Sequence, residues 1–218
     1  MIEVILNTLI KTQIPTDFFA RDCSEVAKAL LGKVIRVNYR MTILSVQIIE
    51  TEAYYVNEKA SHASLGYTKK RRALFMPPGT IYMYYSRAGD SLNVSCLGDG
   101  NAVLIKSGIV YQDRYSGHDA IAIMQQLNPP RNGIGHREVK KLCSGQTLLC
   151  RSLGLTVPAW DARQFNKNFF ISDVDYVPDK ISCTPRLGIP CGRDEHLLLR
   201  FVDHSHYQYA TPSRWKIK

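Results

Sequence analysis

Residues 43–54, ILSVQIIETEAY, have the branched and alternating composition of a long β-strand. The run 33–37, KVIRV, has the same character, and the polar residues 38–40 lie between the two. We therefore expect paired strands over 33–37 and 43–54, joined by a polar turn.

More strands follow in the second third of the chain, at 80–85, 91–96 and 102–106, separated by glycine-containing turns. This spacing predicts a meander. Helix signals occur over three stretches, which are 24–31, 134–142 and 146–153. Two later strands are expected, at 169–172 and 197–202. The pattern predicts a single α+β domain over 1–218, with a mainly antiparallel sheet and a loose segment at 1–15.

Cap residues are expected at the ends of two of these helices. Asp22 or Ser24 would cap the helix over 24–31, and Gly32 would end it. Ser144 would cap the helix over 146–153, and Gly154 would close it.

The composition excludes several classes of protein. The 218 residues include 28 Lys and Arg against 19 Asp and Glu, a formal charge of +9 (28 − 19). With 45% hydrophobic residues the chain can bury a sizeable core, so wholesale disorder is excluded. No window approaches the roughly 18 apolar residues of a membrane span, and the start Met1-Ile2-Glu3-Val4 is acidic. We expect neither a membrane protein nor a secreted one.

The cysteines and histidines fit neither a disulfide scaffold nor a zinc site. Six cysteines are spread over more than 200 residues, and no C-x-x-C pair occurs. The last cysteines and histidines match no standard zinc spacing; they are Cys183, Cys191, His204 and His206. The glycine motifs of nucleotide-binding loops and the G-x-S-x-G of serine hydrolases are also missing. We expect free thiols, a cytosolic location and a chemistry without metal or cofactor.

Positive charge is concentrated in a long polar loop, 55–78, which contains Lys69-Lys70-Arg71-Arg72 beside Tyr67, Thr68 and Phe75. A second basic set follows, made up of Arg131, His136, Arg137, Lys140 and Lys141. Cations beside aromatic and hydroxyl groups are typical of contacts with phosphates and bases. Nucleic acid is thus a candidate partner, although a surplus of this kind also occurs in proteins for solubility alone.

Acidic residues at the end of the stretch 43–54 are unusual for so apolar a strand. On a strand Glu50, Glu52 and Tyr54 share one face, while Thr51 and Ala53 lie on the other. A carboxylate beside an aromatic ring can act as a general base toward water. The alternative is an edge strand whose acids face solvent.

Flat rings with polar tips are expected near that carboxylate. They are Tyr54, His62, Tyr82, Tyr84 and Tyr85. Such rings can sandwich a nucleobase, and their faces favour a cationic one. The alternative is that the strand tyrosines are ordinary half-buried sheet residues.

Several ordered blocks of sequence carry a family resemblance. They are 30–34 (LLGKV), 50–54 (ETEAY), 75–84 (FMPPGTIYMY), 93–95 (NVS), 98–100 (GDG), 142–145 (LCSG), 186–189 (RLGI) and 199–201 (LRF). In residues and spacing these blocks resemble the alkyladenine (3-methyladenine) DNA glycosylases, also called methylpurine-DNA glycosylases, from about residue 25 onward.

The resemblance implies a curved antiparallel sheet flanked by helices and a monofunctional DNA glycosylase. Such an enzyme flips a damaged purine out of double-stranded DNA and hydrolyses its N-glycosidic bond without a cofactor, which initiates base-excision repair. The implied substrates are alkylated or deaminated purines of the 3-methyladenine, 7-methylguanine and hypoxanthine type. Flipping is needed because the bond lies inside the base stack.

The same resemblance implies roles for individual residues. Glu52 matches the residue that activates the attacking water. Three rings match positions that stack on or bond the flipped base: Tyr54, His62 and Tyr84. Asn93 matches a position that clashes with the 2-amino group of normal guanine, and Leu104 completes the pocket wall. Phosphate contacts are implied for Thr68, Lys69, Lys70, Arg71 and Arg72.

Two departures from the family pattern concern DNA contacts. The hairpin after Tyr84 lacks the tyrosine that wedges into the duplex, and we expect Arg87 or Tyr85 to replace it. Lys106 stands where relatives have arginine. An amine there raises the question of Schiff-base lyase chemistry, but a glutamate base and water suffice.

Three functions stay open on the sequence: a DNA glycosylase, a nonenzymatic binder of damaged or structured nucleic acid, and a cysteine- or metal-dependent hydrolase. Glu52 beside Tyr54 and His62 favours the glycosylase. For that enzyme we expect a monomer, double-stranded DNA with damaged purines as partner, no membrane contact, and a bacterial cytoplasm in association with the nucleoid.

Overall fold

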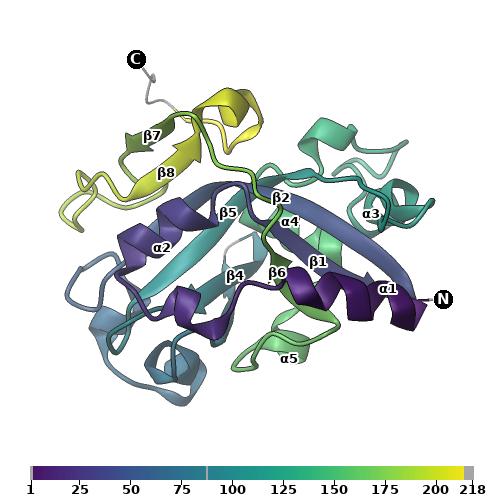
Figure 1. Ribbon diagram of the computed structural model, residues 1–218. Helices are drawn as coiled ribbons and strands as arrows, with labels where there is room; N and C mark the ends of the chain where they lie inside the picture. Colours follow the sequence, from purple (N-terminus) through teal and green to yellow (C-terminus); the bar gives the residue numbers. More distant parts are fainter. Residues whose placement is uncertain (1, 87, 214–218) are drawn as a thin grey trace.

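The sheet is organised around one long strand, β2 (Thr42–Tyr54), in the computed structural model, which describes residues 2–86 and 88–213. Along one edge β2 pairs with β5 (Ala102–Val110). Along the other edge its first half pairs with β1 (Val34–Tyr39) and residues 50–52 pair with β8 (Arg200–Asp203). The end of β2 is therefore covered by strands on both sides (Figure 1).

Four further pairings complete the sheet, and every pairing among the described strands is antiparallel. The strand order is β3-β4-β5-β2-β1-β6, and β7 joins through β8. The remaining strands are β3 (Ile81–Ser86), β4 (Gly89–Ser95), β6 (Phe169–Ser172) and β7 (Ile181–Thr184). This single compact α+β domain confirms the predicted fold class, including the meander β3-β4-β5.

Helices cover the sheet from several parts of the chain. They are α1 (Ile2–Leu9), α2 (Cys23–Leu30), α3 (Ala120–Leu127), α4 (Gln146–Leu153) and the short α5 (Val157–Trp160). Helices α2, α3 and α4 share one apolar cluster with strand residues such as Leu44, Val46 and Ile48. Helix α1 packs elsewhere, through Leu6 and Leu9 on Ile43 and Phe170. Burial of these apolar faces is the main stabilising term.

The cap residues explain where two helices begin and end. The Asp22 carboxylate accepts from the backbone N–H groups of Ser24 and Glu25 at the start of α2, as predicted. Gly154 takes a left-handed conformation (φ +64°) and closes α4. Ser144 does not cap α4, because Gly145 occupies the cap position and the Ser144 hydroxyl donates to the Ala210 carbonyl.

Two expectations from the sequence were wrong, and a third, the strand at 197–202, was right except for its start. The segment expected to be loose contains helix α1 with two fully buried leucines. Only the 3-10 turn η5 (Val139–Lys141) forms within 134–142, since Gly133 and Gly135 have positive φ and interrupt the helix. The strand expected from 197 begins at Arg200. Helix α3 and strand β7 were not expected at all.

Short 3-10 helices occupy the polar loop after β2. They are η3 (His62–Leu65) and η4 (Lys69–Phe75). Elsewhere in the chain, 3-10 helices form at η1 (Ile10–Thr12), η2 (Thr16–Phe19) and η6 (His204–Tyr209). Ala63, Ala73 and Leu74 of this loop are buried against Tyr82 and Ala102 of the sheet. The loop is thus packed onto the sheet. None of the described helices is both long and apolar enough to cross a bilayer.

Candidate functional site

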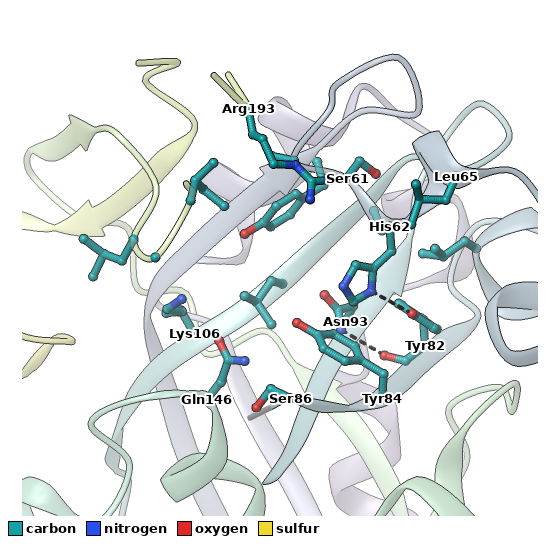
Figure 2. Close-up of a pocket in the computed structure, with 18 of the residues that line it drawn as sticks. Ser61, His62, Leu65, Tyr82, Tyr84, Ser86, Asn93, Lys106, Gln146 and Arg193 are labelled. Atoms are coloured by element: carbon teal, nitrogen blue, oxygen red, sulfur yellow. Dashed lines mark hydrogen bonds between the residues drawn. The ribbon is translucent and has the colours of Figure 1, made fainter. Parts of the chain in front are cut away.

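A cavity of about 650 Å³ lies on the face of the sheet that carries Glu52. Its wall is built from four strands, the 60–65 segment, the first residue of α4 and the segment 187–193. The wall includes four rings and two cations: Tyr54, His62, Tyr82, Tyr84, Lys106 and Arg193. All of these except Tyr54 are labelled in Figure 2. A concave, mostly apolar space with a few convergent polar groups is the usual form of a ligand site.

Strand register places the site residues in one row across the sheet. Tyr82 lies opposite Asn93, Asn93 opposite Leu104, and Leu104 opposite Glu52. Residues directly opposite each other on neighbouring strands point to the same face. Four residues from four strands therefore line up beneath the cavity, and Arg200 of β8 continues the row beyond Glu52.

Irregular pairing around Glu50 keeps the acids of β2 on this face. The register with β5 shifts between Ile48 and Thr51, as it does at a β-bulge. Glu50 and Glu52 consequently have different partners but the same orientation, in agreement with the predicted shared face. Glu50 is a structural residue: its fully buried carboxylate accepts from Arg200 Nε at 2.6 Å and from the Thr211 N–H at 2.8 Å.

The Glu52 carboxylate is fully buried just behind the cavity wall. Its Oε2 accepts from the Tyr54 hydroxyl at 2.8 Å and lies 3.3 Å from Lys106 Nζ. Its Oε1 accepts from the Leu187 backbone N–H at 3.1 Å. All three partners line the cavity. The carboxylate is thus fixed by three donors, and the residues that carry them lie between it and the cavity.

Arg186 packs against the face of the Tyr54 ring. Its guanidinium carbon lies 4.5 Å from the centre of the Tyr54 ring, a cation–π distance. The same group donates to the Ala53 carbonyl at 2.8 Å and pairs with Glu58 at 2.5 Å, in a buried position. Burial and the neighbouring Glu52 raise the pKa of Tyr54 well above its ordinary value. Tyr54 therefore remains a protonated donor to Glu52 at any working pH.

The opposite wall is a cluster of three rings. His62 lies edge-on to Tyr84, with 4.4 Å between ring centres, and Tyr82 stacks beside Tyr84 at 5.5 Å. The His62 Nδ1 and the Tyr82 hydroxyl are 3.0 Å apart. Desolvation lowers the pKa of His62, and the nearby Arg71 and Arg193 add to this effect. A neutral imidazole is the form favoured here.

Asn93 and Leu104 lie at the floor of the cavity, both nearly fully buried. The Asn93 amide donates from Nδ2 to the Tyr82 carbonyl at 3.1 Å, which fixes the orientation of the side chain. Gln146, at the start of α4, donates to Ser91 Oγ at 2.7 Å and also lines the cavity near Lys106 (Figure 2).

The basic run of η4 divides into two pairs. Lys69 and Lys70 are exposed and lie outside the cavity wall, as does Thr68. Arg71 donates to the His62 carbonyl at 2.9 Å, and Arg72 donates to the Lys69 carbonyl and pairs with Asp161 at 3.5 Å. The two arginines thus also stabilise the loop that carries His62.

The hairpin between β3 and β4 lies at the rim of the cavity. Tyr85 is 66% exposed there and lines the rim. Arg87, the other residue expected to wedge into DNA, lies outside the described residues. Lys106 is inside the wall beside Glu52. No cluster of three or more His, Cys, Asp or Glu side chains in the described part of the chain is arranged to hold a metal ion.

Comparison with known proteins places this site in a family. The model of the family "Methylpurine-DNA glycosylase (MPG)" matches residues 17–207. A protein of Pseudomonas syringae is 54% identical over 92% of this chain and 90% of its own length. A protein of Pseudomonas aeruginosa is 55% identical over 91% of this chain and 83% of its own. Both carry the name "Putative 3-methyladenine DNA glycosylase".

The chain belongs to the methylpurine-DNA glycosylase family. A relative from Koribacter versatilis, 31% identical over 87% of this chain and 88% of its own, bears the same name. The protein is accordingly a DNA N-glycosylase, a hydrolase of DNA repair whose partner is DNA. The family assignment made from the sequence blocks is confirmed.

Several residues of this glycosylase site were missed by sequence reasoning. Leu187, Arg193 and Gln146 line the cavity, and Arg186 lies under Tyr54. The block 186–189 was noticed only as part of the resemblance, and its contact with Glu52 through the Leu187 N–H has no side-chain signature. Tyr82 carried a signal, because it alternates with Tyr84 on one strand face.

Proposed function

We propose that this DNA glycosylase removes alkylated or deaminated purines, of the 3-methyladenine, 7-methylguanine and hypoxanthine type, and so initiates base-excision repair. One observation carries the proposal: the buried Glu52 carboxylate lies directly behind a ring-lined cavity on the Tyr54 side. A flipped purine in this cavity would have its sugar at the end where Glu52 and Lys106 lie.

The donors around Glu52 support a role in activating water. Two of its contacts are at Oε2 and one is at Oε1, and each carboxylate oxygen accepts about two hydrogen bonds. Oε1 therefore keeps capacity for a water that attacks C1′ of the nucleotide. The proton would pass to the carboxylate, and the negative charge would stabilise the oxocarbenium-like sugar as the base leaves.

The ring cluster supports binding of the extruded base. Tyr54 forms one wall, and His62 and Tyr84 face it from the loop and from β3. Base-to-ring stacking contributes about 1–3 kcal/mol per base, which offsets the few kcal/mol needed to unstack a poorly paired lesion. Asn93 at the floor would exclude the 2-amino group of normal guanine.

We also propose the route of the DNA. Thr68, Lys69 and Lys70, with Arg71 and Arg72 behind them, would bind phosphates, and Tyr85 would enter the duplex at the rim. We also propose that the active form is a monomer. Its substrate would place the enzyme at the bacterial nucleoid.

The Glu52→Gln variant tests the proposal, because it keeps the side-chain shape and removes the base. Oligonucleotides with hypoxanthine or 3-methyladenine are incubated with each protein, and abasic sites are cleaved with alkali. We expect strand scission with the wild type and a loss of at least about 100-fold in the variant. The variant should still bind the same duplex. Equal scission by both proteins would contradict the role of Glu52.

A further inference from the structure

Arg193 is a cation at the mouth of the cavity that neither the family pattern nor the reaction accounts for. It lines the wall opposite Lys106 and Gln146, and Figure 2 shows its side chain pointing into the cavity from above, next to Ser61. No carboxylate of residues 2–86 and 88–213 forms an ion pair with it. Arg193 is exposed, and its guanidinium faces the space where the base would lie.

A latch with Lys59 fixes the orientation of this guanidinium. Arg193 donates from Nε at 2.9 Å, and also from Nη2, to the Lys59 carbonyl. The neighbouring Asp194 accepts from the Lys59 N–H at 2.7 Å. Both backbone groups of Lys59 are thus bound by consecutive side chains. This latch joins the segment before His62 to the segment 187–193.

The latch leaves one edge of the guanidinium free. Nε–H and one Nη2–H serve the Lys59 carbonyl. The other edge, with Nη1–H and the second Nη2–H, has no further partner among the residues that the structure describes. Two parallel N–H donors of this kind match a pair of acceptors such as O6 and N7 of a 6-oxopurine.

The position of Arg193 relative to Glu52 decides which part of a nucleotide it would meet. In the proposed function, the sugar lies at the Glu52 and Lys106 end. The purine then extends away from the sugar, toward the wall formed by residues 60–62 and Arg193. The 6-substituent lies at the far end of the purine from the sugar, so it is the group that this wall would meet, and N7 is the acceptor beside it.

We propose that Arg193 is a specificity-determining residue that reads O6 and N7 of the flipped base, so that the pocket prefers neutral 6-oxopurines, hypoxanthine above all. Hypoxanthine presents both acceptors and lacks the 2-amino group that Asn93 would exclude. Adenine-type lesions present an amino donor at position 6, and a methyl group on N7 blocks one acceptor. A cationic base also meets the positive charge of Arg193. This inference rests on the proposed function.

The test compares two lesions in the same variants. Single-turnover release of hypoxanthine and of 3-methyladenine is measured for the wild type, Arg193→Ala and Arg193→Lys. We expect Arg193→Ala to slow hypoxanthine release roughly tenfold or more and 3-methyladenine release less than about twofold. Arg193→Lys should recover only part of the loss, since an ammonium lacks the planar fork.

Three further variants separate the effect from folding and from phosphate binding. Asp194→Ala breaks the other half of the latch and should leave the ratio of the two rates unchanged. Lys70→Ala removes an exposed cation and should lower both rates alike. Lys167→Ala, at an exposed ion pair with Glu3 on α1, should change neither rate. Thermal unfolding of each variant shows whether it is folded.

Two results would overturn the inference. Equal losses for both lesions in Arg193→Ala would make Arg193 a phosphate contact, and no loss for either would remove it from recognition. Binding of a duplex with 2′-fluoro-2′-deoxyinosine, which resists cleavage, gives a second readout and should weaken in Arg193→Ala. If the wild type releases neither base, the proposed function is overturned together with the inference. If the wild type releases both bases and Arg193→Ala slows both releases equally, only the inference is overturned.

Discussion

Tyr54 donates a hydrogen bond of 2.8 Å to the carboxylate of Glu52, two residues earlier on the same strand. Alternate residues of a strand point to one face, so this contact is built into β2. It couples the ring that would stack on a base to the group that would activate water.

Tyr54→Phe should lower the single-turnover rate about tenfold and leave duplex binding within about twofold. The phenyl ring keeps the stacking surface and the contact with Arg186, while Glu52 loses one donor. Rates on a hypoxanthine duplex and binding by fluorescence anisotropy measure the two effects. A variant that loses binding as strongly as rate would show that the hydroxyl acts on the base.

Lys106→Met should destabilise the protein by about 3–5 kcal/mol, because it leaves the fully buried Glu52 without its cation. Chemical denaturation measures the loss, and Lys106→Arg should keep most of the stability. The double variant Glu52→Gln/Lys106→Met should be more stable than Lys106→Met alone. Additive losses in the double variant would mean that the two side chains do not interact.

Arg200→Met should also destabilise the fold by about 3–5 kcal/mol, since Glu50 and Arg200 form a completely buried ion pair. Glu50 also binds Ser107 and the Thr211 backbone, so the loss should loosen residues near 211 first. Urea unfolding and hydrogen exchange of the Thr211 amide measure these effects. Unchanged exchange at Thr211 would contradict the link between the pair and the end of the chain.

His62 should titrate below its ordinary pKa of 6.5, and Arg193→Gln should raise that pKa. Desolvation is the larger cause, and the charges of Arg71 and Arg193 add to it. Because the folded-state pKa is depressed, the contribution of His62 to stability is present above pH 6.5 and is lost as the pH falls through the folded-state pKa. NMR titration of the His62 ring measures both proteins, and a His62→Gln variant should lose this part of the pH dependence.

Local patterns predicted most of the strands and the α2 helix, because hydrophobic periodicity and helix-cap residues depend only on neighbours in the sequence. They failed where distant packing decides. Ile2–Leu9 becomes a helix with buried leucines only against Ile43 and Phe170. The failure at 134–142 has a local cause instead: Gly133 and Gly135 adopt positive φ at its start, and only the 3-10 turn η5 forms.

The predicted site residues were named mainly by family resemblance, and all five predicted to bind the base line one cavity. Sequence reasoning did not find Arg193 or the Leu187 N–H. The Leu187 N–H bonds to Glu52, and Arg193 bonds to the Lys59 carbonyl. Each contact joins distant parts of the chain through a backbone group, so the spacing of side chains in the sequence gives no sign of it.

The sequence by itself determined the alternation that puts Glu50, Glu52 and Tyr54 on one strand face, and the family to which the chain belongs. Only the tertiary structure decided that Glu50 pairs with Arg200 as a structural ion pair while Glu52 lies behind the cavity with Tyr54, Lys106 and Leu187. The physical reason is strand register. Pairing of β2 with β5 on one edge and with β8 on the other selects the cation beside each carboxylate. Lys106 of β5 lies 54 residues from Glu52 in the sequence, and Arg200 of β8 lies 150 residues from Glu50.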